Sequence, residues 1–236
     1  MEELMKVFDI PGVDSSDEKL RQLSGYMEGI LDFNESINLT AITDRKEFIA
    51  KHYIDSLMCA AMDEINDADT VIDVGTGGGF PGVPLAIAFP EKKFTLIDSL
   101  NKRIKIVNQL CDELEIKNVR AIHGRAEELA RKKDMREQFD ICVSRAVANM
   151  ATLSEYCLPF VKVGGSFIAY KGPDCESEVK EASNAIEKLG GCLLRIERPE
   201  ADGVAFDHRL IVVKKIAATA AKFPRKPGTP SKEPMK

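Results

Sequence analysis

The sequence predicts a doubly wound α/β fold, in which helices cover both faces of a mostly parallel sheet. From residue 70 onward, short apolar runs typical of strands alternate with runs typical of helices. The first strand-like run, 70–74, leads into four glycines within five positions, and a helix-like run follows at 83–89. A strand, a glycine turn and a helix in this order present bare backbone N–H groups to a nucleotide-like ligand.

The expected core spans residues 66–216, and its elements follow in chain order. Strands are expected at 70–74, 93–98, 118–123, 139–144 and 166–171. Helices are expected at about 81–89, 100–114, 127–133, 150–158 and 174–189, with Ser99 as the N-cap of the second. The apolar runs 192–197 and 209–214 fit an antiparallel C-terminal hairpin that closes the sheet.

Residues 1–65 predict a helical cap in front of this core. Apolar side chains at helical spacing indicate one helix within 15–35 and a second from about 44 to 62. His52 and Asp55 lie three positions apart on the second helix. We expect a structural contact between them, and a polar pair near a functional site is the alternative.

Composition narrows the class of protein. The chain has 236 residues, of which 44% are hydrophobic and 30% charged, as in globular proteins. Without a long apolar run, a secretory signal or paired cysteines, we expect a cytoplasmic monomer that neither spans a membrane nor binds a structural metal. The net charge is −5, but residues 214–236 carry seven Lys/Arg and one acid. The basic, flexible tail at 217–236 either contacts phosphates or only aids solubility.

The glycine turn narrows the kind of ligand. A dinucleotide fingerprint G-x-G-x-x-G/A that starts at Gly75 requires a small residue at position 80, where this chain has Phe80. A pyrophosphate is therefore not expected. Asp98 ends the second strand, where a carboxylate can hold a ribose diol. The alternative is an ordinary strand–turn–helix in which the glycines serve only packing.

The pattern D-x-G-x-G-x-G that begins at Asp73 resembles motif I of the class I S-adenosyl-L-methionine (SAM) methyltransferases, which have a Rossmann-like sheet. The resemblance implies that Asp73 and the turn glycines Gly75, Gly77 and Gly79 cradle the amino-acid part of SAM. It assigns the ribose to Asp98.

Two cations, Arg145 and Lys171, end neighbouring strands, at the edge where ligands bind in such sheets. Beside a sulfonium cofactor they are best explained by an anionic substrate or an electron-rich base. The alternative is that both pair with acids such as Glu127 or Asp98.

The residues after the fourth strand limit the target atom. They lack the Asn/Asp-Pro-Pro-aromatic motif typical of enzymes that methylate exocyclic amines. Cys142 and Cys157 lie inside an apolar strand and helix, where neither is well placed as the nucleophile that pyrimidine carbon five requires. A nucleophile with its own lone pair, such as guanine N7, is compatible with the sequence. Its methylation needs alignment and electrostatics rather than a dedicated base.

Together these motifs resemble the bacterial RsmG (GidB) family of small-subunit ribosomal RNA guanine-N7 methyltransferases. The matching segments cover most of the chain and are 38–42, 52–57, 73–82, 98–103, 124–128, 144–146, 171–172, 209–215 and 225–230. The resemblance implies that the substrate is a guanine in the 530 loop of 16S rRNA, within the small ribosomal subunit. It implies SAM contacts from Gly75, Phe80, Asp98, Ala126, Glu127 and Arg145. It assigns the guanine and its phosphates to Arg125, Arg145, Lys171 and the basic tail.

Two rival hypotheses remain at this point. An NAD(P) oxidoreductase would use the same kind of sheet, and Phe80 argues against it. A non-catalytic RNA-binding module that binds SAM for folding or sensing would share every motif and form no product.

Overall fold

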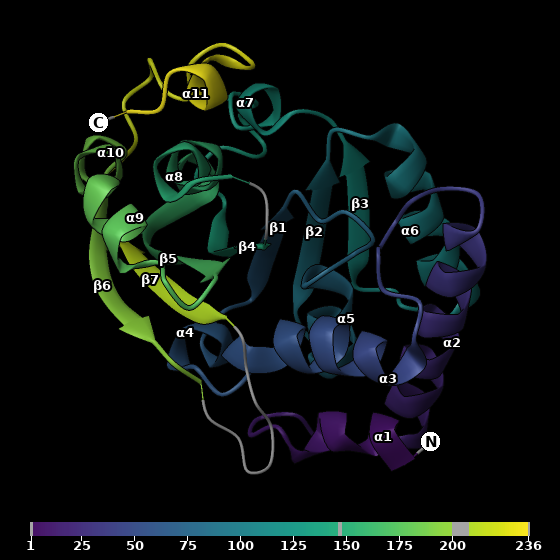
Figure 1. Ribbon diagram of the computed structural model, residues 1–236. Helices are drawn as coiled ribbons and strands as arrows, with labels where there is room; N and C mark the ends of the chain where they lie inside the picture. The colour runs from purple at the N-terminus through teal and green to yellow at the C-terminus, as the bar shows by residue number, and fades with distance from the viewer. Residues whose placement is uncertain (1, 146–147, 200–207, 236) are drawn as a thin grey trace.

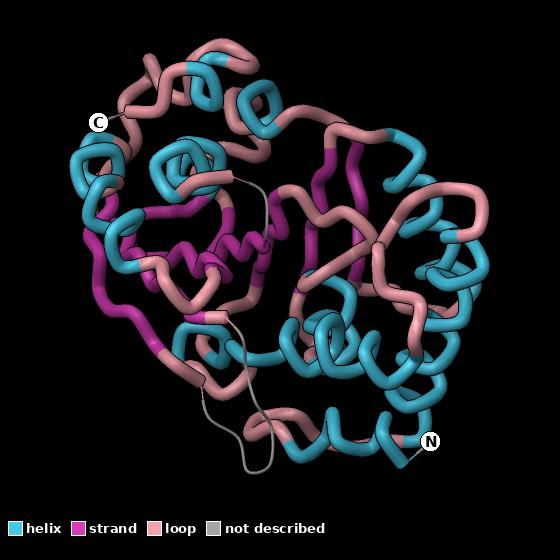
Figure 2. Tube along the Cα trace, in the orientation of Figure 1, coloured by secondary structure: helices cyan, strands magenta, loops and turns pink. Residues whose placement is uncertain are grey.

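The computed structural model describes residues 2–145, 148–199 and 208–235. Its centre is a seven-stranded sheet in the order β3-β2-β1-β4-β5-β7-β6 (Figures 1 and 2). The strands are β1 (Thr70–Val74), β2 (Lys93–Asp98), β3 (Val119–His123), β4 (Phe139–Arg145), β5 (Val161–Lys171), β6 (Gly191–Glu197) and β7 (Arg209–Lys215). The first five strands are parallel, whereas β7 is antiparallel to both β5 and β6. The predicted fold class and closing hairpin are confirmed.

Alternating side chains of the strands build a hydrophobic core on each face of the sheet. Val71 belongs to the cluster beneath α2, α5 and α6, whereas its neighbour Ile72 belongs to the cluster beneath α8, α9 and α10. The helices that cover the faces are α5 (Gly82–Ala88), α6 (Asn101–Glu113), α7 (Ala126–Leu129), α8 (Met150–Cys157), α9 (Glu176–Glu181) and α10 (Ser183–Lys188). Parallel strands covered on both sides explain the continuous apolar runs in the sequence.

Several predicted boundaries differ from the structure. β5 begins at Val161, so Gly164 and Gly165 lie inside the strand rather than in a turn before it. The helix expected at 174–189 is divided into α9 and α10 at Ala182. Ser99 does not cap α6: Leu100 is the residue before the helix, and no side chain caps the helix start.

The N-terminal part is helical as expected, but it shares its core with the sheet. It comprises α1 (Glu2–Met5), η1 (Lys6–Asp9), α2 (Asp17–Asn34), α3 (Arg45–Phe48), η2 (Ile49–Ile54), η3 (Leu57–Cys59) and α4 (Asp63–Asn66). The helix expected from about 44 to 62 is thus a short α-helix followed by a π-helical and a 3₁₀ turn. Tyr26 and Phe48 are fully buried in the same cluster as β1 and α5. A boundary at residue 65 stays a prediction.

The C-terminal segment 217–235, which includes α11 (Thr229–Lys232), differs from the flexible tail that composition predicts. It crosses α8 beside α7 (Figure 1), and Phe223 is buried in the hydrophobic cluster beneath α8, α9 and α10. Arg136 holds it by donating to the carbonyls of Thr219 at 2.6 Å and Phe223 at 2.9 Å. We call residues 217–235 the C-terminal strap.

None of the helices in the described parts of the chain combines the length and apolar character needed to cross a bilayer.

Candidate functional site

The strand order places a topological switch point between β1 and β4. From β1 the chain proceeds to β2 and β3 on one side, and from β4 it proceeds to β5 on the other. Ligands of open α/β sheets bind in the crevice at the carboxyl ends of such neighbours. Here that edge carries the glycine turn after β1 and Arg145 at the end of β4.

Asp73 supports the glycine turn from inside. Its side chain is fully buried, and Oδ2 accepts hydrogen bonds from Thr76 Oγ1 at 2.6 Å and from the Gly82 N–H at 2.9 Å. Burial raises its pKa to about 6, although these two hydrogen bonds oppose the shift. Asp73 therefore ties the turn to the start of α5, and it does not line the cavity described below.

Two glycines of the turn are required for different reasons. Gly77 has φ +59°, and a Cβ added there would meet nothing nearer than Arg103 at 3.9 Å. Gly79 has φ +91°, and its Cβ would lie 2.2 Å from Tyr26 Oη. Conformation alone therefore selects glycine at 77, whereas both conformation and close packing select it at 79.

Asp98 connects the ends of β1 and β2. Its Oδ2 accepts the Gly77 N–H at 3.0 Å, and its Oδ1 accepts the Leu100 N–H at 2.7 Å. Arg103 Nη1 lies 3.8 Å from Oδ2. Because each carboxylate oxygen has two acceptor sites, Asp98 retains acceptor capacity for the hydroxyls of a ribose.

A cavity of about 230 Å³ opens beside Asp98. Its lining residues are Val74, Gly75, Ile97, Asp98, Ser99, Gly124, Arg125, Ala126, Glu127, Tyr156, Gly228 and Ser231. Small-molecule pockets span roughly 300–1,000 Å³, so this cavity suits the nucleoside part of a larger cofactor. It brings together five predicted site residues, namely Gly75, Asp98, Arg125, Ala126 and Glu127.

The remaining predicted residues lie outside that cavity. Phe80 is buried, stacks on His52 with ring centroids 4.3 Å apart and lies beneath the Arg145 guanidinium at 5.7 Å. Gly77 and Gly79 belong to the turn, which Asp73 supports from β1. A contact of these side chains with the cofactor stays a prediction, as does a cofactor contact of Arg145.

Arg145 lies in a partly buried network that sequence reasoning missed. Its Nη1 donates to Asp55 Oδ2 at 2.5 Å and to the Lys51 carbonyl at 2.9 Å, and its Nη2 lies 3.0 Å from His52 Nδ1. His208 Nδ1 lies 2.6 Å from the other oxygen of Asp55. His52 and Asp55 thus both bind Arg145, rather than forming the mutual contact expected.

Burial of the His52 ring and the neighbouring Arg145 charge lower the pKa of His52 to about 3. The ring is therefore neutral at physiological pH. Because its Nδ1 faces an arginine donor, it accepts there and carries its proton on Nε2, 2.7 Å from Thr40 Oγ1. His52 has no free nitrogen that could serve as a catalytic base.

The other two predicted cations differ in their surroundings. Lys171 Nζ is paired with Glu178 Oε1 at 2.7 Å and also donates to the Ala148 carbonyl. The pairing alternative for Arg145 and Lys171 thus describes the structure, but with Asp55 and Glu178 as the acids. Arg125 is exposed at the cavity and has no ion pair within the described residues. Ala146 of the S-R-A segment lies outside them.

Cysteine chemistry has no support at this edge. Cys142 and Cys157 are both fully buried, and burial raises the pKa of the Cys142 thiol well above its usual value. A thiol that remains protonated and closed to solvent is a poor nucleophile.

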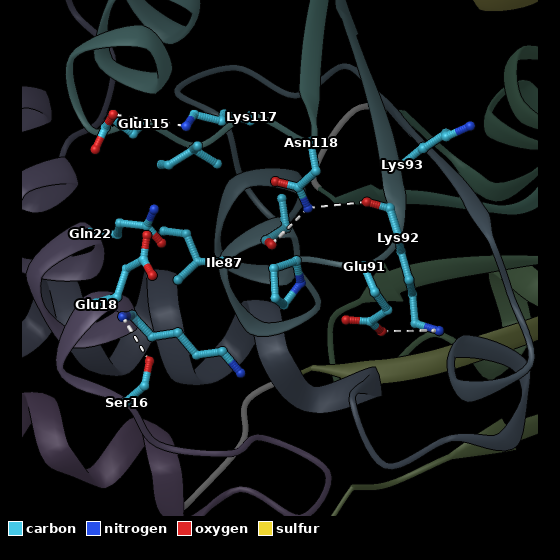
Figure 3. A pocket seen from close by; sticks show the side chains of 14 residues that line it. Ser16, Glu18, Gln22, Ile87, Glu91, Lys92, Lys93, Glu115, Lys117 and Asn118 are labelled. Atoms are coloured by element: carbon cyan, nitrogen blue, oxygen red, sulfur yellow. Dashed lines mark hydrogen bonds and ion pairs between the residues drawn. The ribbon is translucent and has the colours of Figure 1, made fainter.

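A larger cavity, of about 510 Å³, lies at the opposite edge of the sheet, near the starts of β2 and β3 (Figure 3). Two of its lysines donate to backbone carbonyls of the protein. Lys92 Nζ donates to the carbonyls of Asn66 and Ala68, and Lys19 Nζ donates to that of Ala88. In Figure 3 Asn118 bonds to the backbone of Lys92. We assign no ligand to it, because substrates bind at the carboxyl edge.

Comparison with known proteins gives one family. Residues 19–203 match the family described as GidB, rRNA small subunit methyltransferase G. A ribosomal RNA small subunit methyltransferase G of Clostridium perfringens is 48% identical over 233 residues, which cover 99% of this chain and 98% of the relative. One from Alkaliphilus metalliredigens is 47% identical over 225 residues, covering 95% and 94%.

Solved structures give the same fold at lower identity. An O-methyltransferase of Bacillus cereus in complex with SAH has a TM-score of 0.55 at 16% identity, covering 80% of this chain and 90% of its own. A SAM-dependent O-methyltransferase of Thermotoga maritima has a TM-score of 0.53 at 19% identity, covering 81% and 72%. At this identity the likeness concerns the fold.

Proposed function

The chain belongs to the family of rRNA small subunit methyltransferases G, and from this premise we propose that it transfers a methyl group from SAM to N7 of a guanine in the 530 loop of 16S rRNA. The observation that carries the proposal is the cavity at the carboxyl edge of the sheet, where Gly75, Asp98, Ala126 and Glu127 converge. We also propose that the protein acts in the cytoplasm, as a monomer, on the small ribosomal subunit.

The residues of the cavity fit SAM. Asp98 has free acceptor sites for the ribose hydroxyls, while its bonds to the N–H groups of Gly77 and Leu100 fix its orientation. Gly75 has φ +76° and presents backbone without a side chain. Ala126 and Glu127 begin α7 on the far wall and would face the nucleoside. Bound SAM supplies an electrophilic methyl group on its sulfonium.

Guanine N7 suits the reacting edge because it attacks with a lone pair and loses no proton. Tyr156 is the other titratable wall residue besides the acids and Arg125, and burial raises the pKa of its hydroxyl, so it stays protonated. His52 is neutral and fully engaged. The protein's task is then to align the base and exclude water.

Near the switch point, Arg145 is paired with an acid whereas Arg125 is exposed. RNA is therefore expected to contact the exposed cation first. Arg145 is neutralised by Asp55, so it adds little repulsion toward a sulfonium. Arg125, exposed and unpaired among the described residues, is the cation that we propose contacts an RNA phosphate. Direct contacts of Arg145 and Lys171 with the guanine remain predictions. Each would require the cation to break its ion pair, with Asp55 or Glu178 respectively.

Small subunits and rRNA from a strain that lacks this gene test the function. Each is incubated with the protein and methyl-labelled SAM, and the RNA is then cut with borohydride and aniline, which cleave at 7-methylguanine. We expect one new cut, in the 530 loop. Label in RNA without a cut would show that the protein methylates RNA at an atom other than guanine N7. Binding of SAM without any labelled product would favour the non-catalytic RNA-binding module.

A further inference from the structure

The C-terminal strap supplies part of the wall of the cofactor cavity. Gly228 and Ser231 line it together with Asp98 and Glu127, although they lie about a hundred residues further along the chain. The Gly228 N–H donates to Glu127 Oε1 at 2.9 Å, and Glu127 is buried. A carboxylate that faces the cofactor site is thus oriented by a backbone group of the strap.

A buried ion pair fixes the strap at this place. Both oxygens of Glu155 on α8 accept from Arg225, with Nη2 at 2.7 Å and Nε at 3.0 Å from Oε2. The Arg225 backbone N–H also donates to Oε1 at 2.6 Å. Only 1% of the Glu155 side chain is exposed, compared with 26% of Arg225. Glu155 is therefore an acid inside the protein that obtains its counter-charge from the strap.

Further contacts continue the anchorage up to the cavity. Thr152 Oγ1 donates to the Pro230 carbonyl at 2.9 Å, and Pro230 is buried. Gly228 has φ +82°, and a Cβ there would meet nothing within 4 Å. A glycine is needed at 228 for the turn itself, which aims the N–H at Glu127, and not for space.

The other cations of the strap have a different environment. Lys222, Lys226 and Lys232 are exposed, and no ion pair involves them within the described residues. Lys215, which precedes the strap, is fully buried and donates to the Leu158 carbonyl at 2.7 Å. The basic residues of 214–236 look alike in the sequence. In the structure some of them anchor the segment and the others face solvent.

We propose that the strap is a structural part of the SAM site: Arg225, held by Glu155, positions the 226–229 turn so that Gly228 orients Glu127 and closes the cavity wall. Arg225 and Glu155 are positioning residues in this scheme, whereas the exposed lysines remain free for RNA phosphates. The inference rests on the proposed function for the identity of the cofactor. It predicts that SAM affinity depends on the strap when no RNA is present.

Titration calorimetry of SAM binding to the full chain, without RNA, tests this. Arg225→Ala and Glu155→Gln should raise the Kd for SAM by about tenfold or more. Arg225→Lys, which keeps the charge but loses the fork, should give an intermediate Kd. Lys188→Ala, at an exposed position of α10 outside the strap, is the control and should leave the Kd within about twofold of wild type. Equal SAM affinity in wild type, Arg225→Ala and Glu155→Gln would overturn the proposal.

Hydrogen exchange of the unmodified protein covers the case in which the variants do not fold. SAM should slow hydrogen exchange of the backbone amides in 226–231, because cofactor binding stabilises the part of the cavity wall that this segment forms. Unchanged exchange in this segment at saturating SAM would contradict the inference. Failure of rRNA methylation by wild type, with these SAM effects intact, would instead refute the proposed substrate alone.

Discussion

Asp98 holds the glycine turn through the Gly77 N–H and also lines the cavity at the carboxyl edge, where we propose that it binds the ribose of SAM. Asp98→Ala should weaken SAM binding by about 1–3 kcal/mol, since the proposed ribose acceptors vanish and the N–H groups of Gly77 and Leu100 lose their acceptor. Calorimetry gives the affinity directly. Asp112→Ala, at an exposed position of α6, is the control. Undiminished SAM affinity in Asp98→Ala would exclude Asp98 from the site.

The Asp55–Arg145 pair gives a second prediction for single residues. Asp55→Asn leaves the Arg145 charge buried without its counter-charge, so the free energy of unfolding should fall by about 3–5 kcal/mol. Urea unfolding measures the loss. The exposed pair Arg45–Glu28 is the control, where Glu28→Gln should cost about 1 kcal/mol or less. A similarly small loss in Asp55→Asn would show that Arg145 finds another partner.

The same pair determines a pH dependence. Burial raises the pKa of Asp55, but the hydrogen bond from His208 and the charge of Arg145 outweigh it and lower the pKa below the usual 3.8. The stabilisation is therefore complete above about pH 4 and is lost as pH falls through the lowered pKa. The stability difference between wild type and Asp55→Asn should shrink when unfolding is measured at successively lower pH. A difference that stays constant down to pH 2 would contradict this assignment.

At the scale of elements, the glycine turn owes its shape to what packs on it. Gly79→Ala should destabilise the fold by more than Gly77→Ala, which meets open space and costs about 1–2 kcal/mol for its positive φ alone. The additional loss in Gly79→Ala comes from the Tyr26 hydroxyl, which donates to the Gly78 carbonyl at 2.9 Å. This hydroxyl cannot move away from the new methyl group without losing that hydrogen bond. Chemical denaturation of both variants measures the difference, and equal losses would show that Tyr26 moves freely.

At the scale of the whole molecule, the division of charge in the strap limits how strongly it can bind RNA. Replacing Lys222, Lys226 and Lys232 by alanine should reduce the slope of log affinity against log salt by about 2–3, since each phosphate contact contributes roughly 0.7–0.9. Filter binding to 16S rRNA fragments at several salt concentrations measures the slope. SAM affinity should be unchanged in this variant. An unaltered slope would place the RNA contacts elsewhere.

Truncation after Ile216 should then have a broader effect than the loss of tail charges. It exposes the buried partners of Phe223 and leaves Glu155 without Arg225, so it should lower both thermal stability and SAM affinity. The four cations of the described strap do not act alike, because Arg225 is paired with Glu155 whereas Lys222, Lys226 and Lys232 are exposed. A truncated protein with wild-type SAM binding and a flattened salt dependence would instead restore the picture of a flexible tail.

The sequence by itself determined the class of fold and which residues line the cavity at the carboxyl ends of β1 and β2. Strand and helix periodicities are local properties, and the glycines after β1 and the acid after β2 follow their strands directly. Once those strands are parallel neighbours, their carboxyl ends meet, so Gly75 and Asp98 were predictable as one site. The helix starts and breaks were less predictable: α6 starts after Leu100 without a Ser99 cap, and a π-helical segment interrupts the helix expected at 44–62.

Only the tertiary structure decided which charges face each other. Asp55 and Arg145 are 90 residues apart, and Glu155 and Arg225 are 70 apart, so no local pattern links them. Glu155 within the apolar run of α8 was the one available signal, because a buried acid requires a partner. The sequence shows how many charges a chain carries. Desolvation and distance, which arise only on packing, decide whether Arg145 is a free cation and which cation of the strap is paired with a buried acid.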